Sequence, residues 1–122
     1  MNSMFRPNEM KSALENRTLK KIQRRMTKDF LDMIIMTMLR NSESLGGYEI
    51  MELVHSRFGF LMSPGTVYAF VYAMEREGLL KGELIGKKRT YTLTDKGKST
   101  IEIINKSKEE LLRFMRALLE SY

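Results

Sequence analysis

The sequence predicts a mainly α-helical protein with a small antiparallel sheet of two to three strands, from three observations within residues 61–94. Residues 63–78 carry apolar side chains at helical spacing, behind a Ser-Pro start and ahead of a glycine. Residues 79–85 and 90–94 have the composition of two short strands. The run 86–89 between them, a glycine and three cations, suits a hairpin tip. A helix followed directly by a ribbon with a basic tip indicates a winged helix-turn-helix.

Residues 1–26 are predicted to form a basic N-terminal arm, in which a helix fits Asn8 to Met26. Residues 1–28 carry eight Lys or Arg and two Glu, a net charge of +6. Residues 29–80 carry three against seven, a net charge of −4. The arm either follows a phosphate backbone or is a solvated basic tract, and the sequence leaves both open. The cations that crowd its second half are Arg17, Lys20, Lys21, Arg24, Arg25 and Lys28.

Residues 27–94 are predicted to form the winged helix-turn-helix itself. Thr27 and Asp29 offer a new helix start, and residues 30–39 are apolar nearly all round, so this helix should be buried on several sides, some of them by a second subunit. A turn over residues 41–47 leads to a helix from Tyr48 to Phe58, which Gly59 ends.

The central helix has two different sides. At helical spacing Val67, Phe70, Val71 and Met74 share the core side. The other side combines small residues with hydroxyls and suits a groove of DNA, because hydroxyls reach base edges or phosphates. A protein–protein surface is the alternative, and Tyr68, at the edge, fits core packing equally well. The residues on this outer side are Gly65, Thr66, Ala69, Tyr72, Ala73 and Arg76.

The predicted wing adds charge that the central helix lacks. Residues 81–98 carry six Lys or Arg and two acidic residues, a net charge of +4. Lys87, Lys88 and Arg89 are placed at the hairpin tip. Each phosphate that they neutralise would release counterions, so binding should weaken steeply with salt.

Residues 95–122 are predicted to form a C-terminal dimerisation helix, capped by Thr94 and continuing to about Glu120, roughly 39 Å at 1.5 Å per residue. A long terminal helix with an apolar seam should pair with a second copy, although packing within one chain remains open. The seam residues are Ile101, Ile104, Leu111, Met115 and Leu118, interrupted by Lys108.

Several classes of protein are excluded by composition. With 122 residues, no cysteine and His55 as the single histidine, the chain offers no disulfide, zinc cluster or catalytic triad. We therefore expect neither an enzyme nor a bound cofactor. No apolar run approaches the ~20 residues of a membrane span, and the first 26 residues lack a signal peptide's apolar core, so we expect a cytoplasmic protein. The 11 methionines either fill the core or line an adaptable pocket for a small-molecule effector.

Four segments carry a resemblance to a known family: Gly47–Ile50, Ser63–Tyr68, Met74–Leu79 and Arg89–Thr94. In residues 29–98 the chain resembles the PadR family of transcriptional regulators. The resemblance implies a winged helix-turn-helix with a C-terminal dimerisation helix. It also implies repression through palindromic operator DNA, with many members released by a small molecule.

Individual residues match the family pattern. Ser63, Thr66 and Tyr68 match the start of its recognition helix, Tyr48 matches the tyrosine that opens the preceding helix, and residues 87–89 match the basic wing. The chain departs from the pattern at Ala69, where the family often has proline, and at residues 72–73, where it often has two cations. The basic N-terminal arm could compensate for those missing cations.

We therefore expect a homodimeric, sequence-specific DNA-binding regulator of transcription, a repressor by resemblance. Its partners would be double-stranded DNA and a second copy of the chain. The alternative is a winged-helix protein-interaction module without DNA binding, which the net negative charge of residues 29–80 favours. The expected DNA-binding residues are Tyr48, Ser63, Thr66, Tyr68, Tyr72, Lys87, Lys88 and Arg89.

Overall fold

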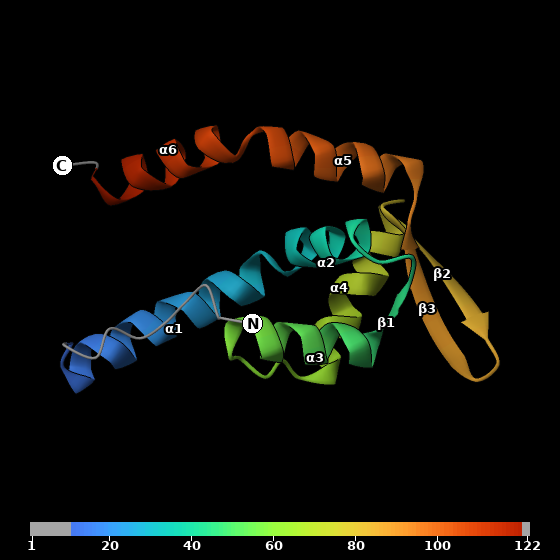
Figure 1. The fold of residues 1–122 in the computed structure, drawn as a ribbon, viewed down its shortest axis with the longest axis horizontal. Helices are drawn as coiled ribbons and strands as arrows, with labels where there is room; N and C mark the ends of the chain where they lie inside the picture. The colour runs from blue at the N-terminus through green and yellow to red at the C-terminus, as the bar shows by residue number, and fades with distance from the viewer. Residues whose placement is uncertain (1–10, 121–122) are drawn as a thin grey trace.

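The computed structural model describes residues 11–120 (Figure 1). The described chain folds as α1 (Ala13–Asp29), α2 (Leu31–Arg40), β1 (Leu45–Gly46), α3 (Gly47–Phe58), α4 (Pro64–Arg76), β2 (Leu80–Ile85), β3 (Lys88–Leu93), α5 (Asp95–Lys106) and α6 (Lys108–Leu119). Helices α2, α3 and α4 and the sheet form the body. Helices α1 and α6 project from it on the side away from the sheet. The predicted mainly helical fold with a small antiparallel sheet is confirmed.

The boundary between α1 and α2 differs from the prediction. Part of the expected start at Asn8 lies outside the described residues, and the helix begins at Ala13 behind the N-cap Ser12. It then continues through Thr27 instead of ending at Met26. The Thr27 hydroxyl donates to the Gln23 carbonyl at 2.7 Å, so it bonds within α1 and caps no new helix. The break falls at Phe30, and α2 follows.

The core is built around α2, as its apolar composition predicts. Leu31 and Ile35 are fully buried within the single chain, so these two side chains need no second subunit to cover them. Helices α4 and α5 and strand β3 contribute the facing side chains. The other core residues are Met36, Met38, Leu39, Leu45, Ile50, Val54, Phe60, Met62, Val67, Val71, Met74, Leu79, Leu80, Tyr91 and Ile101.

The sheet is antiparallel with strand order β1-β3-β2. The two-residue strand β1 lies in the segment that the sequence predicted as a turn. Strands β2 and β3 are joined by a two-residue turn, because Ile85 pairs with Lys88. The prediction that Lys88 and Arg89 lie at the tip is therefore wrong: both belong to β3, and Lys87 remains in the turn.

The C-terminal helix is not continuous. It breaks at Ser107, where the backbone N–H bonds to the Ile104 carbonyl, and α6 begins at Lys108. Serine is a weaker helix former than most residues of α6, which favours a break there. The Thr94 cap is as predicted, since its hydroxyl accepts from the Gly97 N–H at 3.0 Å.

Gly97 is the position in the fold where a side chain should cost most. A Cβ there would collide with the backbone carbonyl oxygen of Leu79. That carbonyl accepts the Thr94 N–H and the Thr94 hydroxyl, both at 3.1 Å, so it has little freedom to move.

We expect Gly97→Ala to lower the free energy of unfolding by about 3 kcal/mol, at the upper end for overpacking. Urea denaturation followed by circular dichroism measures it. Gly65→Ala is the matched control, because a Cβ there meets nothing within 4 Å. The control should be neutral or stabilising by up to about 1 kcal/mol. Equal stability of both variants would contradict the close packing of α5 on Leu79.

Candidate nucleic-acid interface

Helices α3 and α4 form the helix-turn-helix, and their connection is set by local chemistry. Gly59 adopts φ +78°, a left-handed conformation that ends α3 at little cost. Ser63 caps α4: its hydroxyl accepts the Thr66 N–H at 3.2 Å and lies 2.9 Å from the Thr66 hydroxyl. Both predicted signals are confirmed. The start of α4 thus presents two neighbouring hydroxyls at the positive end of the helix dipole, which favours an anionic partner.

The two sides of α4 are as predicted. Val67, Val71 and Met74 are buried, and Phe70 is partly buried against the same core. On the other side Tyr72 is 45% exposed. The small residues Gly65 and Ala69 are also exposed, so another surface can approach the helix closely.

Tyr68 joins α4 to α3. Its ring occupies the space where a Cβ on Gly47 would lie, so Tyr68 is half-buried and only glycine fits beneath it. The Tyr68 and Tyr72 rings are 5.7 Å apart between centroids. Tyr48 follows Gly47 and is 65% exposed. The structure therefore brings the three predicted tyrosines to one end of the helix-turn-helix, two exposed and one packed.

Two of the three predicted wing cations are paired with carboxylates of the helix-turn-helix. Lys88 Nζ lies 2.7 Å from Glu49 Oε1 on α3. Arg89 Nη2 lies 2.8 Å from Glu75 Oε2 on α4. These pairs are partly exposed, and exposed pairs contribute little net energy, so either cation can exchange its carboxylate for a phosphate.

The carboxylates have structural partners as well. Glu49 also accepts the Gly46 N–H at 2.9 Å and so caps α3, and Glu75 accepts the Gly82 N–H at 3.2 Å. The hydrogen bond from Lys88, followed by that from Gly46, lowers the pKa of Glu49. The nearby charge of Glu75 raises the pKa of Arg89. The wing is thereby fixed to both helices.

The sequence pattern does not reveal these two carboxylates. Their partners lie 39 and 14 residues away in the chain. No spacing rule connects them, since the pairing depends on the strand register and on how β3 lies beside the helices. The sequence offered only a general hint of these pairs: acidic residues on two helices and cations in a strand of the same small domain.

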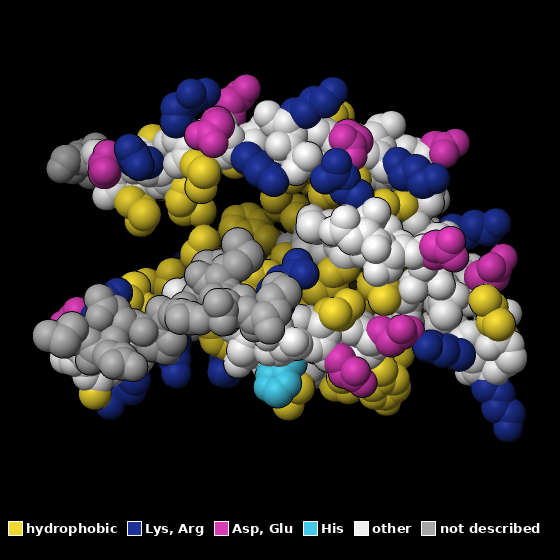
Figure 2. Space-filling model, in the orientation of Figure 1, with side chains coloured by type: hydrophobic (Ala, Val, Ile, Leu, Met, Phe, Trp, Pro, Cys, Tyr) yellow, Lys and Arg dark blue, Asp and Glu magenta, His cyan; other side chains and the backbone are white. Residues whose placement is uncertain are grey.

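The predicted dimerisation residues differ in how far they are buried within the single chain. Ile101 is 3% exposed and packs in the core of its own chain, so it is not available to a partner. Ile104 and Met115 are partly buried, whereas Leu111 and Leu118 are 45% and 57% exposed. Apolar side chains of α6 and α1 face the space between these helices (Figure 2). By helical spacing the exposed apolar side chains Leu19, Ile22 and Met26 share one side of α1, whereas Leu14 falls among the cations.

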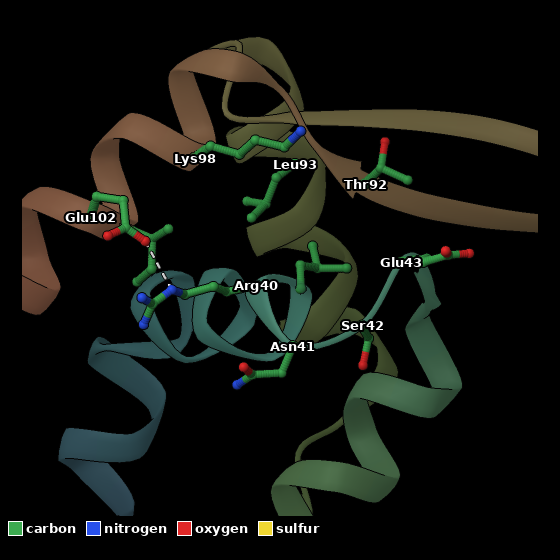
Figure 3. Close-up of a pocket in the computed structure, with 10 residues that line it drawn as sticks. Arg40, Asn41, Ser42, Glu43, Thr92, Leu93, Lys98 and Glu102 are labelled. Atoms are coloured by element: carbon green, nitrogen blue, oxygen red, sulfur yellow. Dashed lines mark ion pairs between the residues drawn. The ribbon is translucent and has the colours of Figure 1, made fainter.

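A pocket of about 790 Å³ lies between the C-terminal end of α2, the end of β3 and the start of α5 (Figure 3). Leu39, Leu93 and Ile101 contribute apolar surface to it, and Lys98 contributes an ammonium group. Arg40 also lines the pocket, where its Nε pairs with Glu102 at 2.9 Å. The carboxylates of Glu43 and Glu102 line it as well, so the pocket combines an apolar surface with charged groups of both signs.

Residues 11–120 hold no group of His, Asp and Glu side chains that could bind a metal ion. None of the helices in this described part has the length and hydropathy of a membrane-spanning segment.

The helix-turn-helix with its adjoining ribbon defines a winged-helix protein. Residues 35–103, more than half of the chain, match the model of the transcriptional regulator PadR-like family. The chain belongs to this family, which confirms the resemblance.

Three relatives show the range of the family. A PadR-like transcriptional regulator (BC4206) from Bacillus cereus is 28% identical with a TM-score of 0.63, over 79% of this chain and 97% of that one. Bacillus subtilis PadR in complex with operator DNA is 26% identical with a TM-score of 0.50, over 59% of this chain and 44% of that one. The transcriptional activator GvpE1 of Halobacterium salinarum is 28% identical over 86 residues, 70% of this chain. The chain spans about half the length of the curated relatives it matches, with 45% of GvpE1 covered.

Proposed function

We propose that this protein regulates transcription by binding double-stranded DNA as a homodimer in the cytoplasm. The observation that carries the proposal is the exposed start of α4, where Ser63 and Thr66 present hydroxyls and small residues follow on the same side. This geometry suits entry into a major groove, with hydroxyls reaching phosphates or base edges. The complex of Bacillus subtilis PadR with operator DNA supports it from a relative.

The proposed roles differ between the contributing side chains. Ser63 and Thr66 would fix the end of α4 on the backbone, and Tyr72 would contact bases or sugars from the exposed side. Tyr68, half-buried against Gly47, would orient α3 relative to α4 and offer its hydroxyl. Tyr48 at the start of α3 would contact the flanking phosphate. Lys87, Lys88 and Arg89 would contact phosphates from the wing.

Dimerisation is proposed from the exposed apolar side chains of α6. Leu111, Leu112, Phe114, Leu118 and Leu119 are all at least 45% exposed, an unusual amount of apolar surface for one short helix. A second copy would cover it and set two α4 helices in successive major grooves, roughly 34–36 Å apart.

A titration against random duplex in low salt tests DNA binding and separates it from the alternative. We expect saturable binding at micromolar protein that weakens with salt, as backbone contacts require. Absence of binding at micromolar protein would favour the winged-helix protein-interaction module.

For the direction of regulation we propose repression. A dimer that covers a promoter would exclude the polymerase, and the family resemblance implies the same direction. Two curated relatives, GvpE1 and GvpE, are named activators, so activation is the outcome that the test must separate from repression. A reporter whose promoter overlaps a bound duplex should lose expression when the protein is present. An increase would reverse the assignment.

The pocket beside α5 is the proposed effector site. Its apolar surface and Lys98 fit a small organic anion, and Bacillus subtilis PadR has been solved with p-coumaric acid. Small aromatic carboxylates, p-coumaric acid first, should raise the melting temperature of the protein, and Lys98→Gln should remove the rise. Lys106→Gln, on the same helix outside the pocket lining, is the control. An equal rise in wild type and Lys98→Gln would exclude this pocket.

A further inference from the structure

Helix α1 has one continuous basic face. At about 100° per residue, its six cations fall within an arc of about 140°, which we call the α1 basic face. All six side chains are exposed, and no ion pair joins any of them to another residue of the described chain. The acidic residues of the helix, Glu15 and Asp29, fall outside the arc. The members of the face are Arg17, Lys20, Lys21, Arg24, Arg25 and Lys28.

This face lies next to the entry of α4. The Arg24 guanidinium carbon is 5.4 Å from the centre of the Phe60 ring, a cation–π contact. Phe60 is 7% exposed and lies in the connection between α3 and α4, three residues before the cap Ser63. In Figure 2, Lys and Arg side chains extend below α1 on the same lower edge that carries basic side chains at the wing. The α1 basic face and the wing thus flank the helix-turn-helix.

The α1 basic face offers more unpaired cations to a DNA backbone than the wing does. Lys88 and Arg89 already have carboxylate partners, whereas the six cations of α1 have none among residues 11–120. On α4 itself, Tyr72 and Ala73 bring no charge. Arg76 is the one exposed cation of α4, so the α1 basic face, with six cations, is the largest cluster of positive charge beside the helix-turn-helix.

Helix α1 also has an exposed apolar side, which is separate from its basic face. Leu19, Ile22 and Met26, each 38–47% exposed, fall on a separate arc from the cations. Apolar side chains of α1 face the space toward α6, where the proposed dimer partner would cover them (Figure 2). A helix lying on an anionic membrane would need that apolar side to enter the lipid. The arrangement favours nucleic acid over a membrane.

We propose that the α1 basic face binds the DNA backbone beside the duplex segment that α4 enters. This inference rests on the proposed DNA-binding function and deepens it by naming a second backbone contact. From Arg17 to Lys28 the face is about 16 Å long, and phosphates of one strand recur about every 3.4 Å along the duplex axis. That length spans about four or five phosphates of one strand.

The test compares salt dependence in three triple variants. Arg17→Gln/Lys21→Gln/Lys28→Gln removes three of the six cations, including both ends of the face, leaves the Arg24–Phe60 contact in place and uses a good helix former. Lys106→Gln/Arg113→Gln/Arg116→Gln makes the same charge change on exposed cations of α5 and α6. Arg17→Lys/Lys21→Arg/Lys28→Arg keeps the charge. Fluorescence anisotropy on one duplex over a series of salt concentrations gives each slope, and circular dichroism checks that each variant is folded.

We expect the first variant to flatten the plot of log affinity against log salt by about 0.9 for each phosphate that is no longer neutralised. The charge-keeping variant should retain the wild-type slope, and the α5–α6 variant should change it far less. Equal slopes for the first variant and wild type would overturn the inference. It would also be overturned if the first variant lost binding to anionic vesicles that wild type binds, while its DNA binding was unchanged. Failure of wild type to bind any duplex would instead overturn the proposed function.

Discussion

Leu111→Asp with Leu118→Asp is expected to convert the protein to a monomer and to weaken its binding to a two-half-site duplex at least about 100-fold. Both side chains are about half exposed in the single chain, so the monomer should stay folded while a carboxylate opposes burial between two copies. The loss of affinity follows because two linked half-site contacts become one, and such linkage contributes about 10²–10⁴ in affinity. Sedimentation equilibrium measures the association state, and anisotropy measures the affinity.

Ala117→Asp is the control for this pair. It adds a carboxylate on the side of α6 away from Leu111, at an exposed position. The control should remain dimeric. If the double variant sediments as wild type does, α6 is not the dimer interface.

Charge reversal in the wing has the second large expected effect. Lys87→Glu with Lys88→Glu should weaken binding to all duplexes, operator or random, by about 10-fold or more, and flatten the salt dependence by about 0.9 for each phosphate left without a cation. The effect should not depend on sequence, because backbone contacts position the protein and do not specify bases. Anisotropy at several salt concentrations measures both quantities.

The Lys88–Glu49 pair makes a second, charge-neutral variant necessary for this test. A glutamate at position 88 would face Glu49, which now pairs with Lys88 at 2.7 Å, so repulsion could also displace the wing. Lys87→Gln with Lys88→Gln removes the charge without that repulsion and should show about half of the loss in log affinity. Lys106→Glu with Arg113→Glu reverses two exposed charges on the opposite edge and should change binding far less. Unchanged affinity and slope in both wing variants would remove the wing from the interface.

Local signals accounted for the parts of the fold that could be predicted. The Ser63 cap, the glycine at 59 and the apolar spacing of α4 each act within a few residues, and each is confirmed. At the end of α4, Gly78 has φ +78°, and the Leu79 N–H reaches back to the Met74 carbonyl at 2.9 Å. Glycine fits this left-handed position without the strain that a Cβ would bring.

Tertiary arrangement decided what could not be predicted. The positions of Lys88 and Arg89 depend on a turn of two residues instead of four, which the basic run 86–89 does not reveal. Their carboxylate partners follow from that register. Ile101 fits the C-terminal seam by spacing. It is buried nevertheless, because α5 packs on α2 and the helix is interrupted only later, at Ser107. A periodic pattern cannot tell an apolar side chain that faces its own core from one that faces a partner.

The central proposal is a dimer that sets two α4 helices into one duplex while basic surfaces contact its backbone. Selection of bound duplexes from a random DNA pool tests it most directly, since the result reports sequence preference and half-site spacing together. We predict enrichment of an inverted repeat whose half-sites are centred about 10–10.5 base pairs, or a multiple of that, apart. Enrichment of a single half-site, or of no sequence at all from a pool that the protein binds, would contradict it.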